Sequence, residues 1–302
     1  MLDDEVAGRC MDRQAQVAAP LVVAGAQRGV VLVPEHLASD LHFGSTKHQN
    51  GALRHFAQAA QDMGVEHVLL SGDVTAGYKM YAGQEMELYA YGSDEQVNAT
   101  CERLPEIEGL HWYLLGGNHD ASHYNHGGTN VVRRICNQRD DCTYLGFAQQ
   151  DIPLAPGVLA RLWHPRGGVP YAVSYRAQKG AEATIREWLL DEQWSEEERA
   201  RIVLLQWGHV HVKGLFWYGN MMLLGPGCFE AQTDYETERA LYPDIGAAVL
   251  EVTMTDNGFI SDLNVLSWKR YKPVADDFRP VKHADLLDCE EVEPLFSLGG
   301  KV

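Results

Sequence analysis

The sequence predicts an α/β fold, with a parallel βαβ unit in its first half and a strand-rich second half. Three observations predict it. Apolar runs of strand length recur along the chain, and a segment with helical periodicity separates the first two. Short polar motifs directly follow several of these runs. Open α/β sheets place their ligand sites beyond the carboxyl ends of strands, so these motifs are candidates for one shared site.

The first elements can be assigned in order from the amino terminus. Residues 1–28 carry little signal apart from a predicted hairpin over residues 21–33, and we expect them to form an N-terminal extension. A strand is predicted over residues 35–42. It would place Asp40 and His42 on the same side at its carboxyl end.

A helix is predicted next because apolar residues recur at spacings of three and four. These residues are Leu53, Phe56, Ala57, Ala60 and Met63. Gly64 can end the helix. The strand at 68–70 then completes a parallel βαβ unit with Gly72-Asp73 at its tip.

The remaining elements follow from the same patterns. Further strands are predicted at 111–115, 158–163, 202–205, 215–217, 221–224, 247–252 and 263–266, further helices near 97–104 and 179–194, a helix start at Ser195 and a hairpin turn at 256–258. We expect residues 121–150 to be an insertion that overhangs the site, and residues 275–302 to be a C-terminal tail. No repeat or linker is visible, so residues 1–302 are expected to form a single domain.

Composition narrows the class of protein. Among 302 residues, 45% are hydrophobic and the formal net charge is −17. This balance argues against tight nonspecific binding to nucleic acid, although bound divalent ions would reverse the sign of charge locally. No apolar run approaches the length of a membrane span, and residues 1–5 lack the features of a secretion signal. We therefore expect a cytoplasmic protein without membrane contact.

Cysteine usage agrees with that compartment. The six cysteines lie at positions 10, 101, 136, 142, 228 and 289, and none forms a C-x-x-C pair. We expect reduced thiols, not a disulfide framework.

Five short motifs carry the chemistry. Gly117-Asn118-His119-Asp120 follows an apolar strand and is expected to place an amide, an imidazole and a carboxylate side by side on a loop. Polar groups held on a loop need partners. Four other clusters could supply them, namely Asp40-Leu41-His42, Gly72-Asp73, His164 and Gly208-His209-Val210-His211.

These motifs contain a mixed set of metal-ligand side chains. Two carboxylates, one amide and four imidazoles suit borderline divalent ions such as manganese, iron or zinc. Seven side chains are too many for one ion and fit two ions that share a bridging carboxylate. Two-metal sites clamp the entering and leaving oxygens of a phosphoryl displacement.

The ordered motifs D-x-H, G-D, G-N-H-D, a single His before a turn, and G-H-x-H span residues 36–212 and resemble the calcineurin-like metallophosphoesterase superfamily. The resemblance implies a four-layer α/β/β/α sandwich of two mixed sheets flanked by helices. It also implies metal-dependent hydrolysis of a phosphoester. A looser similarity, over the segment after His164, links the chain to a phage and archaeal subgroup of unassigned substrate.

The resemblance also implies a role for each motif residue. Asp40, His42 and His211 would hold one ion, Asn118, His164 and His209 the other, and Asp73 would bridge them. A hydroxide between the ions would be the nucleophile. His119 would act as general acid and Asp120 would orient its ring. Manganese is the favoured ion, with iron, zinc or nickel as alternatives.

The adjacency of two motif residues supports the acid role independently. Asn118 and His119 are consecutive, so both are not expected to face one ion. An amide is a poor acid, which leaves proton transfer to the imidazole.

The substrate is expected to be a phosphodiester in a nucleotide or a nucleic acid, because a protonating His helps most when an alkoxide leaves. Both a nuclease of the DNA-repair type and an enzyme acting on small or cyclic nucleotides fit this expectation. Arg166, Tyr175 and Arg176 are candidate substrate contacts. The alternative enzyme is a phosphomonoesterase or protein phosphatase. The alternative of another class is a non-catalytic, metal-binding scaffold subunit. The sequence does not indicate an oligomeric state.

Overall fold

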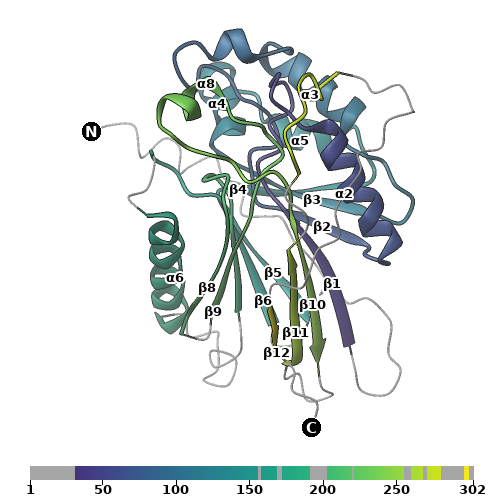
Figure 1. The fold of residues 1–302 in the computed structure, drawn as a ribbon, viewed down its shortest axis with the longest axis vertical. Coiled ribbons are helices and arrows are strands. Elements are labelled where there is room, and N and C mark those ends of the chain that lie inside the picture. The colour runs from purple at the N-terminus through teal and green to yellow at the C-terminus, as the bar shows by residue number, and fades with distance from the viewer. Residues whose placement is uncertain are drawn as a thin grey trace.

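The computed structural model describes residues 31–155, 158–168, 172–190, 203–219, 221–254, 260–267, 271–279 and 296–298. A first mixed sheet is built from β1 (Val31–Ala38), β2 (His67–Leu70), β3 (His111–Gly116), β4 (Cys142–Phe147), β10 (Ala248–Met254), β11 (Ile260–Ser267) and β12 (Phe296–Leu298). Its strand order is β12-β11-β10-β1-β2-β3-β4. Strands β1, β2, β3 and β4 run parallel to one another, and β10 pairs antiparallel with β1 (Figure 1).

A second mixed sheet has the order β5-β6-β7-β9-β8. Its strands are β5 (Gln149–Ala155), β6 (Val158–Trp163), β7 (Val203–Trp207), β8 (Lys213–Tyr218) and β9 (Met221–Pro226). Strands β6, β7 and β9 are parallel, whereas β5 and β8 pair antiparallel at the two edges. The parallel centres of both sheets therefore direct their carboxyl ends into loops that can carry ligand residues.

Helices lie on the outer faces of the two sheets and beyond the ends of their strands. They are α2 (Asn50–Asp62), α3 (Gly92–Arg103), α4 (Asn118–Gly127), α5 (Val131–Cys136), α6 (Val173–Leu190) and α8 (Asp234–Glu238), with a 3-10 turn at Gln84–Glu87. Helices α2, α3 and α5 lie against the first sheet, and α6 lies against β7, β8 and β9 of the second (Figure 1). The predicted four-layer α/β/β/α sandwich is confirmed.

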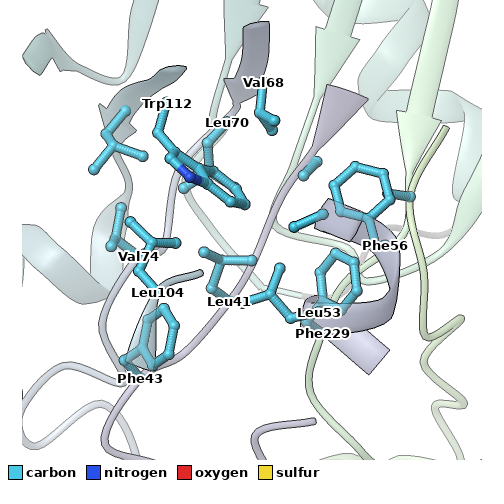
Figure 2. Close-up of a cluster of buried hydrophobic side chains, with 14 of the residues drawn as sticks. Leu41, Phe43, Leu53, Phe56, Val68, Leu70, Val74, Leu104, Trp112 and Phe229 are labelled. Carbon is cyan, nitrogen blue, oxygen red and sulfur yellow. The ribbon is translucent and has the colours of Figure 1, made fainter. Parts of the chain in front are cut away.

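Alternating side chains of one strand show why both faces of the first sheet are buried. Leu69 of β2 packs between the two sheets, whereas Val68 and Leu70 point to the helix side. Figure 2 shows the latter pair near Leu53 and Phe56 of α2, all completely buried. Burying a side chain of this size stabilises the fold by about 1.5–3 kcal/mol. The strand ends that carry the polar motifs are thus anchored from both sides.

Helix α2 is confirmed with one correction. Leu53, Phe56, Ala57 and Ala60 are buried as predicted. Met63 was expected on the same face, but its side chain is 37% exposed. The helix ends at Asp62 and Met63 is its C-cap, so this residue has already left the helical stripe.

The prediction that residues 121–150 form an overhanging insertion is wrong. They contain most of α4, all of α5 and the edge strand β4. Val131, Val132 and Ile135 are completely buried in the core of the first sheet. The prediction that Asn118, His119 and Asp120 lie on a loop is also wrong, because they form the first turn of α4.

Several predictions fall wholly or partly outside the described residues. Residues 21–24, the helix start at Ser195 and the turn at 256–258 are among these. Strands β10 and β11, which flank that turn, do pair antiparallel as a hairpin requires. The cysteines in the described part of the chain, at 101, 136, 142 and 228, are free thiols. Within the same part, no helix combines the length and apolar character needed to cross a bilayer.

Candidate metal centre

The motif residues follow the carboxyl ends of strands from both sheets. Asp40 and His42 follow β1, Asp73 follows β2, and Asn118 opens α4 after β3. His164 follows β6, while His209 and His211 follow β7. Two sheets that face each other bring these ends to one edge of the sandwich, so residues far apart in sequence meet there.

Five of these residues have left-handed backbone conformations. The φ angles are 54° at Asp40, 52° at His42, 50° at Asp73, 79° at His209 and 55° at His211. The prediction that Asp40 and His42 lie on a strand is therefore wrong, because β1 ends at Ala38. Non-glycine residues at positive φ are uncommon, and such strain clusters at functional sites.

Two glycines of the motifs make room for the ligand side chains. A Cβ on Gly72, whose φ is +107°, would lie 2.2 Å from Nδ1 of His164. A Cβ on Gly117 would lie 2.1 Å from Oδ1 of Asp73. The glycines preceding Asp73 and Asn118 are therefore required by close packing around the centre.

Asp40, His42 and His211 form what we call the first pocket. The Nε2 atoms of the two imidazoles are 3.0 Å apart. Oδ1 of Asp40 is 3.4 Å from Nε2 of His211 and 3.8 Å from Nε2 of His42. Both carboxylate oxygens of Asp40 also accept the backbone N–H of His209, at 3.1 and 3.0 Å. This contact ties the first pocket to the loop after β7.

Asn118, His164 and His209 form the second pocket. Oδ1 of Asn118 is 3.0 Å from Nε2 of His164 and 2.8 Å from Nδ1 of His209. Asp73 lies between the pockets, with Oδ2 at 3.0 Å from Nε2 of His164. The Asp73 carboxylate lies with His42 and His119 in one group of potential metal ligands, and with His164 and His209 in another. Within each group, the ligand atoms lie within 4.8 Å of one another.

The outward nitrogens of three imidazoles donate to oxygen acceptors. Nδ1 of His164 donates to the Ser71 carbonyl at 2.7 Å, and Nε2 of His209 donates to the Gly167 carbonyl at 2.7 Å. Nδ1 of His211 donates to the Glu236 carboxylate at 2.9 Å. Carbonyl and ionised carboxylate oxygens only accept, so these ring nitrogens carry the proton. The inward nitrogens of the neutral rings are therefore unprotonated.

With neutral rings, the inward atoms of the centre would face one another as acceptors. His164 and His209 both face the Asn118 oxygen, and Nε2 of His42 faces Nε2 of His211. Such contacts are unfavourable unless a ring takes a second proton or a cation lies among them. The mixed oxygen and nitrogen donors, with their second nitrogens already bonded, fit two divalent cations.

The pKa values of His164 and His209 also indicate that the second pocket favours a positive charge. Burial lowers the pKa of His164, but the charge of Asp73 outweighs it and raises this pKa to about 9. Burial and the charge on His164 lower the pKa of His209 to about 4.

His119 is oriented by a backbone carbonyl. Its Nδ1 donates to the Ala76 carbonyl at 2.6 Å, and its backbone N–H donates to Oδ1 of Asp73 at 2.8 Å. Nε2 faces the centre, 4.0 Å from Oδ2 of Asp73. Burial lowers the pKa of His119 to about 4.

The prediction that Asp120 orients the His119 ring is wrong. The Asp120 carboxylate accepts N–H groups from Val74 at 3.1 Å, Thr75 at 2.8 Å and Gly117 at 2.9 Å, as well as the Thr75 hydroxyl at 2.8 Å. It therefore joins the loop after β2 to the start of α4. Burial and the charge of Asp73 raise the pKa of Asp120 to about 6.

Replacing Asp120 by Ala is expected to destabilise the fold by about 3 kcal/mol, because buried donors lose their acceptor. Urea unfolding of the chelator-treated protein measures this change. Asp94→Ala is the matched control, since the Asp94 side chain is 79% exposed. We expect the control to change stability by less than about 0.5 kcal/mol. Equal stability of the two variants would contradict the clamping role.

A cavity of about 510 Å³ opens beside the centre. Asp73, Asn118, His119, His209 and His211 contribute to its wall. Carboxylates of Glu87, Glu230 and Glu236 and the rings of Tyr81 and Tyr235 also line it. The described lining residues include no lysine or arginine.

Arg166, Tyr175 and Arg176 are not among the lining residues. The Arg176 guanidinium donates to the carbonyls of Arg166 and Gly168, and Tyr175 is 52% exposed. Arg176 therefore braces the loop whose glycines 167 and 168 form part of the cavity wall. Direct substrate contact by these three residues stays a prediction.

Sequence analysis missed the groups that surround the ligands. The Ser71, Ala76 and Gly167 carbonyls belong to the backbone and have no sequence signal. Glu236 could have been found, because Thr233 and Glu236 form the T-x-x-E pattern of a helix capping box. That pattern predicts the start of α8 but not the contact with His211.

Comparison with known proteins places this geometry in a family. The profile of the calcineurin-like phosphoesterases matches residues 36–239. DNA polymerase II small subunits are similar: that of Halobacterium salinarum is 25% identical over 255 residues, covering 73% of this chain and 48% of that protein. The Methanothermobacter thermautotrophicus protein is 23% identical over 239 residues, covering 69% and 50%.

The chain thus spans about half the length of these curated relatives. Among solved structures, Yfce, a phosphoesterase from E. coli, is 18% identical with a TM-score of 0.40, covering 78% of this chain and 92% of that one. The family profile covers more than half of the chain and includes all five motifs. The chain therefore belongs to the calcineurin-like phosphoesterase family.

Proposed function

We propose that this protein is a metal-dependent phosphodiesterase with a dinuclear centre. The observation that carries the proposal is the convergence of imidazole nitrogens, an amide oxygen and the Asp40 carboxylate around Asp73. Asp40, His42 and His211 would hold one ion, Asn118, His164 and His209 the other, and Asp73 both. Manganese is the favoured ion. When bound, the ions would supply Lewis acidity and an activated water nucleophile.

The residues of the chain would perform the remaining steps. Nε2 of His119 lies at the cavity wall while Nδ1 is fixed on the Ala76 carbonyl, so a proton can leave the ring only toward the centre. His119 is therefore suited to protonate a leaving alkoxide.

The cavity favours a diester over a monoester. A monoester dianion has one more negative charge than a diester, and the Glu230 carboxylate lines a cavity whose described lining residues include no lysine or arginine. Like charges placed together cost several kcal/mol. This argument supports a phosphodiester substrate and disfavours the phosphomonoesterase alternative.

The test compares two chromogenic substrates with Mn²⁺-loaded protein. We expect bis-p-nitrophenyl phosphate to be hydrolysed with a kcat/KM at least about 10-fold above that of p-nitrophenyl phosphate. Protein treated with a chelator is the control and should be inactive until Mn²⁺ is restored. A preference for the monoester would contradict the diester assignment.

The relatives' name bears on the physiological substrate and partner. They are small subunits of a DNA polymerase, a name that implies assembly with at least one further subunit. We therefore place DNA phosphodiesters first among the substrates to be tested, followed by cyclic and small nucleotides. A panel of single-stranded DNA, duplex DNA and cyclic dinucleotides separates a nuclease from a nucleotide phosphodiesterase.

The same name favours a second candidate, a non-catalytic, metal-binding subunit of such an assembly. The two candidates differ in turnover. Protein that binds two Mn²⁺ ions but hydrolyses neither chromogenic substrate nor any member of the panel would support the subunit role.

A further inference from the structure

We propose that Glu236 is a positioning residue that makes the first pocket bind its ion more tightly than the second. The inference rests on the dinuclear centre proposed above. Glu236 accepts the Nδ1 proton of His211 at 2.9 Å, and the two side chains are only 9% and 13% exposed. This contact fixes the ring with Nε2 directed at His42 and Asp40.

The Glu236 carboxylate is itself held in place. Its Oε2 accepts the backbone N–H of Thr233 at 2.9 Å and the Thr233 hydroxyl at 3.1 Å. Thr233 and Glu236 form the capping box of α8, so the carboxylate is positioned by a local helix start. The acceptor for His211 is thus ordered by contacts that do not involve the ligand side chains.

The second pocket has weaker outer partners. The outward nitrogens of His164 and His209 donate to the neutral carbonyls of Ser71 and Gly167. A carboxylate partner raises the basicity of an imidazole more than a neutral carbonyl, because negative charge stabilises the positive charge drawn toward the metal-facing nitrogen.

The charges of the donors act in the same direction. The first pocket contains the Asp40 carboxylate where the second contains the neutral amide of Asn118. Glu230 adds a further carboxylate oxygen 3.7 Å from Nε2 of His42. Asp73 is shared and does not distinguish the pockets. The first pocket therefore presents the greater negative charge to a divalent cation.

Titration of the full chain with Mn²⁺, followed by EPR and equilibrium dialysis, tests the inference without an activity assay. We expect the wild-type protein to bind two ions in separate steps. Asn118→Ala should remove only the weak step, which assigns that step to the second pocket. Glu236→Gln should weaken the tight step by about 10–100-fold and change the weak step by less than about 2-fold.

The weak step is an internal check that the Glu236 variant is folded. Glu238→Gln is the matched control, because Glu238 lies in the same helix with its side chain 77% exposed. Nitrogen-15 spectra of the imidazoles provide a second readout, in which the His211 signals should shift in the Glu236 variant alone. Equal weakening of both steps, or of neither, would overturn the inference. Wild-type protein that binds no Mn²⁺ would instead overturn the proposed function.

Discussion

Asp73→Asn is expected to lower the kcat for bis-p-nitrophenyl phosphate on the order of 10³-fold. Asp73 is the only one of the seven predicted ligands that belongs to both pockets in the proposed assignment. Its Oδ2 is 3.0 Å from Nε2 of His164, and Oδ1 accepts the backbone N–H of His119. An amide of the same shape keeps one oxygen but removes the negative charge between the ions.

The measurement combines steady-state kinetics with Mn²⁺ stoichiometry. Asp62→Asn, an isosteric change at an exposed position of α2, is the control and should leave both unchanged. We expect Asp73→Asn to bind fewer than two ions at a Mn²⁺ concentration that saturates the wild type. Full activity of this variant with two bound ions would contradict the bridging role.

The sequence predicts the metal centre better than its surroundings because ligand chemistry restricts residue types. Carboxylates, amides and imidazoles at the ends of apolar strands are few, so Asp40, Asp73 and His164 could be found without knowing how the sheets pack. The strands themselves are short and strongly apolar, which made β2, β3, β6 and β9 predictable.

The backbone at the centre could not be predicted from the same motifs. Asp40 and His42 alternate as strand residues do, yet both are in the left-handed region after β1 has ended. The Gly72 carbonyl accepts the N–H of Asp40, and the Asp73 carbonyl accepts those of Leu41 and His42. These contacts between two loops replace strand geometry, and they depend on residues about thirty positions away.

The segment 121–150 shows another limit. Its many histidines, glycines and arginines suggested a loop, so two helices and an edge strand were not predicted there. Val131 and Ile135 lie four positions apart and pack together, but α5 has only six residues and gives too short a period to recognise. The role of Asp120 was also predicted wrongly. A carboxylate next to a histidine in sequence suggests that the two side chains form a hydrogen bond, whereas the first turn of α4 directs the Asp120 carboxylate toward Val74 and Thr75.

His119→Ala is expected to affect two substrates unequally. For a diester with an alkoxide leaving group, kcat should fall by about 10²–10⁴-fold, because the loss of general acid catalysis leaves the departing oxygen unprotonated. For bis-p-nitrophenyl phosphate the leaving phenolate is stable without a proton, so the loss should be less than about 10-fold. Parallel kinetics on a dinucleotide and on the chromogenic diester measure the difference.

A matched control separates acid catalysis from structural damage. His126 lies on the same helix, is exposed, and donates through Nδ1 to the Ser122 carbonyl, so His126→Ala should leave both rates unchanged. An equal fall for both substrates in His119→Ala would mean that this ring orders Asp73 and the Ala76 loop instead of delivering a proton. A loss that grows with the basicity of the leaving group, in a variant that still binds two Mn²⁺ ions, identifies Nε2 of His119 as the acid, because intact metal binding excludes the loss of an ion that stabilises the leaving oxygen.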